Sequence, residues 1–494
     1  MISGRILALL CLSFPIAVRA EPRKPNVILI MADDLGWGDT GYNGNKVIRT
    51  PHLDEMAAQG LRMDRFYSAS AVCSPTRASC LTGRNPYRTG VFSANVGILR
   101  PEEITLPEIL RQHGYATGHF GKWHLGTLTA ERKDANRGKP GNTRDFNPPR
   151  KHGYDACFVT ESKVPTWDPM RVPAKFRKGE SLKMGWEPLE PGRESVAYGT
   201  RYWDIDGEPV SDNLAGDDSR VIMDRVLPFI DRAKEAEKSF LAVVWFHAPH
   251  LPCVAGPEYQ ILYKDHPLET RNYAGCITAL DEQVGRLRKH LAKLGIADDT
   301  MIWFCSDNGP EGKANGRNGS AGTFRGRKRD LLEGGIRVPG LLVWPAKIRE
   351  ARATSIPCVT SDYLPTVLDA AGIPYPDTRR HLDGVSLMPL IDGTMEKRGK
   401  PIGFLIADRF AVQDDDFKIL GTSRGMSQLY QIAADPGENR DLSGDQPDAF
   451  ATRVSLFRSW LTSVHDSFEG AEYGRESNER MKQAWPRPCE RMAR

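Results

Sequence analysis

The sequence lacks the cysteine pattern of a small disulfide-rich protein. Its nine cysteines are scattered over 494 residues, with no CxxC pair and no dense spacing. Small secreted domains that depend on disulfides concentrate their cysteines at short intervals. That class is therefore excluded, and most of these cysteines are expected to be small buried apolar residues.

An excess of charge of one sign is also missing. The chain has 67 Lys and Arg against 63 Asp and Glu, a formal net charge of +4. Charge therefore predicts neither a nucleic-acid partner nor an acidic polymer as a partner. We find no internal repeat and no low-complexity tract. The length predicts a sizeable core divided between two or three structural units, and the sequence gives no indication of the oligomeric state.

No apolar run is long enough to predict a membrane span. The N-terminal run from Ile6 to Val18 falls short of the roughly 20 residues that cross a bilayer. Arg5 precedes it, and the small residues Val18 and Ala20 come before Glu21, which is the order of a secretory signal peptide. Residues 1–20 are therefore predicted to be cleaved and the protein to be exported: periplasmic or secreted, or lysosomal in a eukaryote. The alternative is a buried N-terminal strand.

Strand-like and helix-like segments alternate along the chain, which predicts an α/β fold with a large, mostly parallel central sheet. The apolar run from residue 27 to 31 is typical of a strand buried on both faces, and "FLAVVWFHAPH" and "MIWFCSDNG" follow the same plan. Between these two lies an amphipathic helix that Gly295 closes. The short segments after residue 395 predict a smaller antiparallel sheet with a helix at about 446–464.

Four units follow from this pattern. After the signal peptide we predict a catalytic α/β domain and a C-terminal α+β subdomain, and the last thirty residues have few apolar positions and are expected to be poorly ordered. A stretch rich in Gly, Pro and charge within the catalytic domain predicts an insert on the substrate side. The predicted ranges are 21–395 for the domain, 127–215 for the insert, 396–465 for the subdomain and 466–494 for the tail.

Carboxylates follow two of the predicted buried strands. Asp33 and Asp34 end the first, and Asp307 and Asn308 end a later one. Because ligands bind beyond the carboxyl ends of parallel strands, these side chains are expected to meet. Adjacent carboxylates repel unless a cation lies between them, and an all-oxygen set favours Ca²⁺ or Mg²⁺ over zinc. Helix N-caps would be the alternative for either pair alone.

Basic groups end other segments. Lys122 and His124 share one side of an extended "GKWHLG", His247 and His250 lie in "HAPHLP", and Lys328 lies in the basic run "RGRKRD". Metal ligands together with convergent cations suit an oxyanion that bridges them.

The segment "VCSPTRASCLTGR" places Cys73 at the expected start of a helix, where main-chain N–H groups favour an anion. A thiolate nucleophile is one hypothesis. However, the spacing is C-x-P-x-R, which excludes the C-x5-R loop of cysteine phosphatases.

This segment resembles the signature of the formylglycine-dependent sulfatases, within the alkaline phosphatase superfamily. It is similar to the motif of the arylsulfatases and of N-acetylgalactosamine-6-sulfatase. Motif order also matches from "PNVILIMADDLGWGD" to "QLYQIAADPGENRDL", apart from the insert and the tail. The resemblance implies an alkaline phosphatase-like fold. It also implies that a formylglycine-generating enzyme oxidises Cys73 and that Arg77 supports the aldehyde.

The resemblance assigns the remaining roles residue by residue. It implies that one metal ion, Ca²⁺ or alternatively Mg²⁺, binds Asp33, Asp34, Asp307, Asn308 and the modified residue 73. It makes Lys122, His124, His250 and Lys328 catalytic, and leaves His247 structural.

In the mechanism that the resemblance implies, the aldehyde hydrates and one hydroxyl attacks sulfur. The second hydroxyl then expels sulfate with help from His124. The expected function is hydrolysis of sulfate esters of a carbohydrate or an aryl alcohol. Two alternatives stay open: a formylglycine-dependent phosphonate monoester or phosphodiester hydrolase, and a secreted protein that binds sulfated glycans without turnover. Aromatic residues of the insert are candidates for stacking on a sugar, or they pack the loops: Trp167, Trp186, Tyr198, Tyr202 and Trp203.

Overall fold

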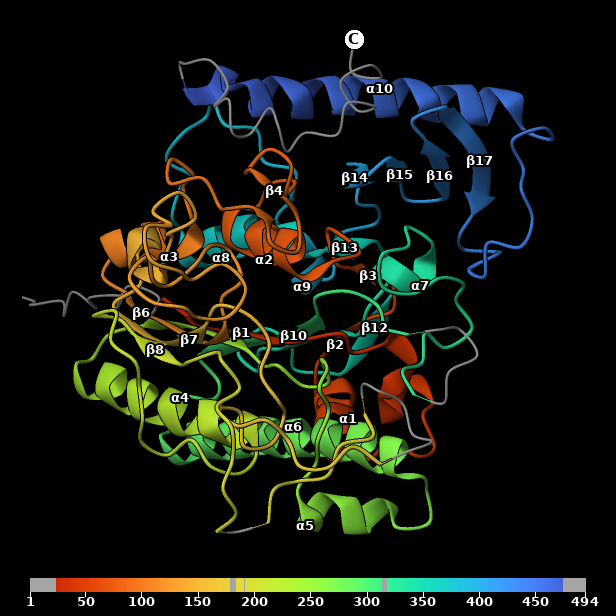
Figure 1. Ribbon diagram of the computed structural model, residues 1–494. Coiled ribbons are helices and arrows are strands. Elements are labelled where there is room, and N and C mark those ends of the chain that lie inside the picture. The colour runs from red at the N-terminus through yellow and green to blue at the C-terminus, as the bar shows by residue number, and fades with distance from the viewer. Residues whose placement is uncertain (1–23, 178–183, 191, 313–317, 474–494) are drawn as a thin grey trace, which may run out of the picture.

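A nine-stranded sheet forms the centre of the molecule (Figure 1). This computed structural model describes residues 24–177, 184–190, 192–312 and 318–473. The strand order is β12-β2-β11-β10-β1-β9-β6-β7-β8. The strands are β1 (Asn26–Ala32), β2 (Leu61–Met63), β6 (Ala116–Lys122), β7 (Ala156–Thr160), β8 (Trp203–Asp204), β9 (Phe240–Trp245), β10 (Thr300–Ser306), β11 (Gly340–Val343) and β12 (Arg352–Thr354).

The strands in the middle of the sheet run parallel. β10, β1, β9, β6 and β7 pair in parallel, whereas β11 and β8 run antiparallel to their neighbours. This arrangement confirms the predicted mixed, mostly parallel sheet. All seven residues of β1 are buried, as expected for a strand covered on both faces. The three strands predicted from apolar runs are the neighbours β10, β1 and β9, so their carboxyl ends meet at one edge.

Two layers of helices cover the sheet (Figure 1). Side chains alternate along β1, so that Leu29 packs in one core and Ile30 in the other. The predicted amphipathic helix is α6, and Gly295 follows it with a φ of 67°. One face carries α2 (Cys73–Thr82), α3 (Leu106–Gln112), α8 (Tyr363–Ala371) and α9 (Met388–Ile391). The other carries α1 (Pro51–Gln59), α4 (Asp218–Glu235) and α6 (Leu268–Lys293).

A four-stranded antiparallel sheet follows the main sheet, as predicted. Its strands are β14 (Ile402–Ile406), β15 (Arg409–Gln413), β16 (Phe417–Thr422) and β17 (Gly425–Gln431). The helix α10 (Pro447–Glu469) packs Phe457 and Leu461 against it and extends beyond the predicted range. The unit boundaries given above stay predictions. The signal peptide and residues 474–494 of the predicted tail lie outside the described residues.

A buried ion cluster joins this smaller sheet to Glu333, in the segment between β10 and β11. Lys418 Nζ of β16 lies 3.0 Å from Glu333 Oε1 and 2.9 Å from Glu438 Oε1, and all three side chains are buried. Tyr67 donates a 2.9 Å hydrogen bond to the other oxygen of Glu333. Glu333 begins the short helix α7 (Glu333–Ile336), five residues after Lys328. The C-terminal sheet therefore helps to fix the segment that carries this lysine.

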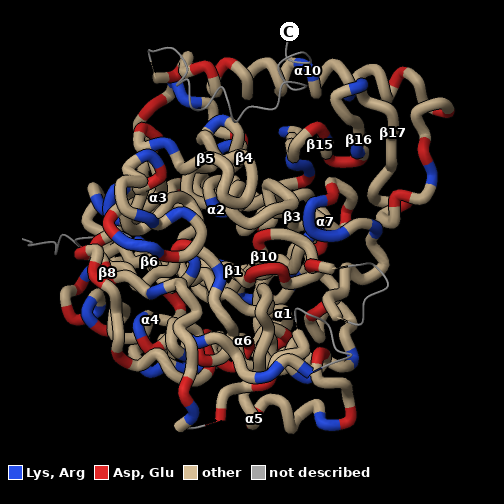
Figure 2. Tube along the Cα trace, in the orientation of Figure 1, with Lys and Arg blue, Asp and Glu red and all other residues tan. Residues whose placement is uncertain are grey.

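Lys and Arg residues are interspersed with Asp and Glu over the elements of the molecule (Figure 2). This pattern agrees with the nearly balanced composition. In the part of the chain that the structure describes, no helix is long and apolar enough to cross a membrane.

Candidate active site

The two predicted acidic pairs meet at the carboxyl edge of the sheet. Asp33 and Asp34 follow β1, and Asp307 and Asn308 follow the adjacent parallel strand β10. The Asp34 main-chain N–H donates to Asp307 Oδ1 at 3.1 Å, and Asn308 Nδ2 donates to Asp34 Oδ1 at 2.7 Å. All four residues are buried. Asp34 adopts a left-handed conformation with a φ of 68°, which is uncommon for a residue other than glycine.

Three oxygen atoms of this cluster need a partner. Among the described residues, Asp33 Oδ1, Asp34 Oδ2 and Asn308 Oδ1 are buried and accept no hydrogen bond. Leaving a buried oxygen unpaired costs free energy, so these positions fit a bound cation. One potential ligand atom from each of Asp33, Asp34, Cys73 and His250 lies within 4.8 Å of the others. The site residues therefore fit a metal ion.

Among His, Cys, Asp and Glu residues, the four-residue cluster differs from the predicted ligand set in two ways. His250 belongs to it, with Nε2 3.7 Å from Asp34 Oδ2. Asp307 is engaged elsewhere, because its Oδ2 accepts from Arg77 at 2.7 Å and its Oδ1 accepts from the Asp34 main chain. The role of Asp307 as a ligand stays a prediction.

Three cations balance the three carboxylates. Lys122 Nζ lies 2.6 Å from Asp33 Oδ2, and Arg77 Nη2 lies 3.5 Å from the same oxygen. Lys328 Nζ donates to Asp34 Oδ1 at 2.5 Å. Burial alone would raise the pKa of Asp33, but Lys122 and the neighbouring cations hold it well below its usual range. Burial raises the pKa of Asp307 to about 7. The formal charges of the three carboxylates and three cations sum to zero, so a bound divalent ion would make the site attractive to an anion.

Cys73 begins α2 directly above this cluster. Val72 before it is extended, and Gly83 ends the helix in a left-handed conformation. Arg77 lies one turn further along, so the two residues share a helix face. Both side chains are buried, and burial raises the pKa of the Cys73 thiol to about 11. The unmodified thiol is therefore protonated at neutral pH.

A cavity of about 480 Å³ opens over Cys73. Its walls come from segments far apart in the chain, including the hairpin of β4 (Val91–Ser93) and β5 (Val96–Gly97) and the turn between β14 and β15. The predicted residues Cys73, Lys122, His124, His250 and Lys328 all line it. The structure thus brings five of the six residues that were predicted to be catalytic to one cavity, and the sixth, Arg77, is not among its lining residues.

The hydrogen bonds of two histidines in the cavity indicate which ring nitrogen carries the proton. His124 Nε2 lies 3.1 Å from Asn95 Oδ1, which only accepts, so Nε2 carries the proton. Its Nδ1 is buried and has no hydrogen-bond partner among the described residues, which leaves a lone pair there. His250 Nδ1 donates to the Leu251 carbonyl at 2.8 Å, so Nε2 faces the cluster. Burial lowers the pKa of His250 to about 4.

His247 lies outside this cavity. Its Nδ1 is 2.7 Å from Asp218 Oδ2 and its Nε2 is 2.7 Å from Thr160 Oγ1, and its side chain is fully buried. These contacts tie the end of β9 to β7 and α4.

Sequence reasoning missed several residues that line the cavity. Asn95, Arg329 and Arg409 belong to no predicted site, and the insert contributes Asn136, Ser162 and Lys163. The five aromatic residues of the insert named above are not among the lining residues. Tyr202, for example, stacks on Phe158 with ring centroids 4.0 Å apart. The sequence signal that could have indicated one of these residues was the basic run, in which Arg329 adjoins Lys328.

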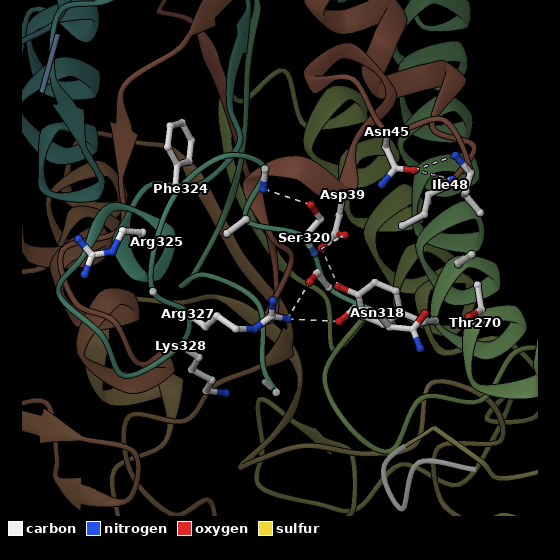
Figure 3. A pocket seen from close by; sticks show the side chains of 18 of the residues that line it. Asp39, Asn45, Ile48, Thr270, Asn318, Ser320, Phe324, Arg325, Arg327 and Lys328 are labelled. Carbon is white, nitrogen blue, oxygen red and sulfur yellow. Dashed lines mark hydrogen bonds between the residues drawn. The ribbon is translucent and has the colours of Figure 1, made fainter. Parts of the chain in front are cut away.

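A second cavity, of about 1,110 Å³, shares Lys328 with the first. There Arg327 donates to the main-chain carbonyls of Asn318 and Gly319 at 3.2 and 2.7 Å (Figure 3). Its side chain is buried. Arg327 thus supports the segment, while the neighbouring Lys328 reaches the cluster.

A cluster of carboxylates and cations beneath a cavity suits a metal ion and an anionic ligand. The comparisons with known proteins give the family. The sulfatase family model matches residues 25–373, and the model of the C-terminal region of N-sulphoglucosamine sulphohydrolase matches residues 319–455. The chain belongs to the sulfatase family and is a sulfuric ester hydrolase, which confirms the resemblance.

The curated relatives that this chain matches are also sulfatases. Steryl-sulfatase of Rattus norvegicus is 33% identical over 442 residues, which cover 79% of this chain and 74% of the relative. Arylsulfatase A of Homo sapiens is 30% identical over 463 residues, covering 86% and 84%. N-acetylgalactosamine-6-sulfatase of Canis lupus familiaris is 30% identical over 408 residues, covering 79% and 70%.

Solved structures share the fold. Ps i-CgsB is 25% identical with a TM-score of 0.73, covering 94% of this chain and 97% of its own. A protein in complex with its substrate D-glucosamine-2-N,6-O-disulfate is 18% identical with a TM-score of 0.67, covering 90% and 99%. The phosphonate monoester hydrolase of Agrobacterium radiobacter is 20% identical with a TM-score of 0.59, covering 89% and 95%.

Proposed function

We propose that this sulfatase acts on a sulfated carbohydrate, with residue 73 oxidised to formylglycine and one Ca²⁺ beside it. The observation that carries the proposal is the position of Cys73 over the three unpaired oxygens of Asp33, Asp34 and Asn308. An oxygen-rich donor set favours a hard ion, with Mg²⁺ as the alternative. When present, formylglycine would supply the nucleophilic hydroxyl, and the ion would supply positive charge next to it.

Each residue of the site has its own role in this proposal. Lys122 and Lys328 face the sulfate oxygens and stabilise the charge that grows on them. Arg77 fixes the positions of residue 73 and the carboxylates through its contact with Asp307. His250, once it carries a proton on Nε2, gives that proton to the leaving alcohol. His124 accepts a proton at its unpaired Nδ1 when sulfate is released.

The carbohydrate substrate is supported by named relatives. One curated relative is an N-acetylgalactosamine-6-sulfatase, and one structure of the same fold holds a sulfated glucosamine. Export and maturation by a formylglycine-generating enzyme belong to the same proposal. They rest on the order of residues 1–20 and on the C-x-P-x-R motif.

Peptide mass spectrometry across residues 71–77 tests the proposal. We expect an aldehyde at residue 73 in protein that hydrolyses 4-nitrophenyl sulfate. An unmodified Cys73 thiol in fully active protein would contradict it. A second candidate, phosphonate monoester hydrolysis, has the Agrobacterium fold likeness in its favour. Faster turnover of an aryl phosphonate than of the aryl sulfate would support that candidate instead.

A further inference from the structure

Five cationic side chains line the cavity over Cys73. Its lining includes no Asp or Glu among the described residues. Lys122 and Lys328 are paired with the buried carboxylates and face the reacting group. Three further cations line the rest of the cavity. The five cationic side chains are Lys122, Lys163, Lys328, Arg329 and Arg409.

Arg329 is held in a strained conformation at this wall. Its φ is 78°, in the left-handed region that glycine adopts readily and arginine adopts rarely. Ten described residues other than glycine have a positive φ, and four of them line this one cavity. Strain of this kind persists where the surroundings enforce it, and it gathers at functional sites. The four are Asn95, His124, Arg329 and Ala407.

Two distant parts of the chain enforce this conformation. The Arg329 main-chain N–H donates to the Ala71 carbonyl at 2.9 Å, two residues before Cys73. The Arg329 carbonyl accepts from Arg409 Nη2, which comes from β15 of the C-terminal sheet. Arg409 is itself held by Asp330, with Nη1 2.9 Å from Oδ1. Both polar main-chain groups of Arg329 are therefore fixed, and Arg409 is the residue that positions it.

The Arg329 guanidinium can still bind a ligand. Its side chain is 57% exposed, and one contact is an ion pair with Glu311 Oε1 at 2.9 Å. A guanidinium has five N–H donors in a rigid fork, so one ion pair leaves donors for a second oxyanion. Glu311 is not among the lining residues of the cavity, although its Oε2 lies 3.7 Å from Lys328 Nζ.

We propose that the substrate carries a second anionic group, a sulfate or a carboxylate, and that Arg329 binds it. This inference rests on the proposed function, because it places the scissile sulfate at residue 73. Charge-assisted bonds from a planar fork suit either group. Lys163, which lines the same cavity, adds positive charge around it. A substrate with one sulfate and a neutral leaving group would leave Arg329 without a role in binding.

The test compares three aryl sulfates: 4-nitrophenyl sulfate, and two ring analogues that carry a second sulfate or a carboxylate beside the first ester. We expect the wild-type KM to be about tenfold lower for at least one doubly charged probe, the effect of one charge-assisted hydrogen bond. Arg329→Gly removes the guanidinium and suits the observed φ. It should raise the KM for that probe about tenfold, while kcat and the KM for the singly charged probe stay unchanged.

Two matched variants complete the design. Arg329→Lys keeps the charge and should retain part of the preference, whereas Arg424→Gly, at an exposed position outside the cavity, should change nothing. The Tm of Arg329→Gly should stay close to that of the wild type, because relief of the backbone strain offsets the greater freedom that glycine gives the unfolded chain.

Equal KM values for all three probes in the wild type would overturn the inference. So would a parallel rise for all three in Arg329→Gly. Absence of hydrolysis of every probe would instead overturn the proposed function, and this inference with it.

Discussion

Replacing Lys122 by methionine tests whether this lysine balances the charge of Asp33 in the active site. Lys122 Nζ lies 2.6 Å from Asp33 Oδ2, and the two side chains are 1% and 0% exposed. Removing one partner of a buried ion pair costs roughly 3–5 kcal/mol, because the remaining charge is left uncompensated. Arg77 stays 3.5 Å from the same oxygen, so we place the loss in free energy of unfolding at the low end, about 3 kcal/mol.

A bound metal ion should reduce this loss. Asp33 Oδ1 accepts no hydrogen bond among the described residues and is free to bind the ion. The stability cost of Lys122→Met should therefore be larger in a chelator than in excess Ca²⁺. Turnover should fall about 10²- to 10³-fold in either case, the usual effect of removing one group that stabilises charge in the transition state.

Denaturant unfolding with EDTA and with Ca²⁺, alongside hydrolysis of 4-nitrophenyl sulfate, gives both quantities. The double variant Asp33→Asn/Lys122→Met replaces the pair by neutral groups and should recover most of the stability in EDTA without recovering turnover. Lys347→Met, at a side chain that is 44% exposed, should behave like the wild type. If Lys122→Met were as stable as the wild type in EDTA, or turned over normally, the reasoning would be refuted.

Three further predictions follow from the site and its surroundings. Cys73→Ser should stall as a sulfated enzyme, detectable by peptide mass spectrometry after substrate exposure; sustained turnover would contradict the aldehyde mechanism. Asp307→Ala should lower both metal content and turnover, and full activity after exhaustive chelation would show the metal site to be misassigned. Burial lowers the pKa of His119 to about 3. Its stabilising contribution is therefore complete above about pH 6.5 and is lost as pH falls toward 3, by up to ~1.4 kcal/mol per pH unit. His119→Phe should flatten that part of the pH profile of denaturant midpoints, and an unchanged slope would exclude His119 as its cause.

The sequence alone determined the central sheet and the residues at its edge. The strands β1, β9 and β10 are continuous apolar runs, and that pattern belongs to strands buried on both faces whatever surrounds them. Because the carboxyl ends of parallel strands share an edge, the positions of Asp33 and Asp307 followed from the strands themselves. The motif at Cys73 likewise lies within a single helix, where local spacing fixes which residues share a face.

Only the tertiary structure decided which residues surround the substrate. The cavity wall joins the β4–β5 hairpin, the end of β7 and the β14–β15 turn, which are far apart in the chain. Arg329 takes its left-handed conformation from Ala71 and Arg409, and local sequence favours the opposite. The five named aromatic residues of the insert were candidates for stacking on a sugar because of their residue type, yet they do not line the cavity. A periodic pattern reports how a segment is buried, whereas the lining of a cavity depends on contacts between segments, and these form only when the chain has folded.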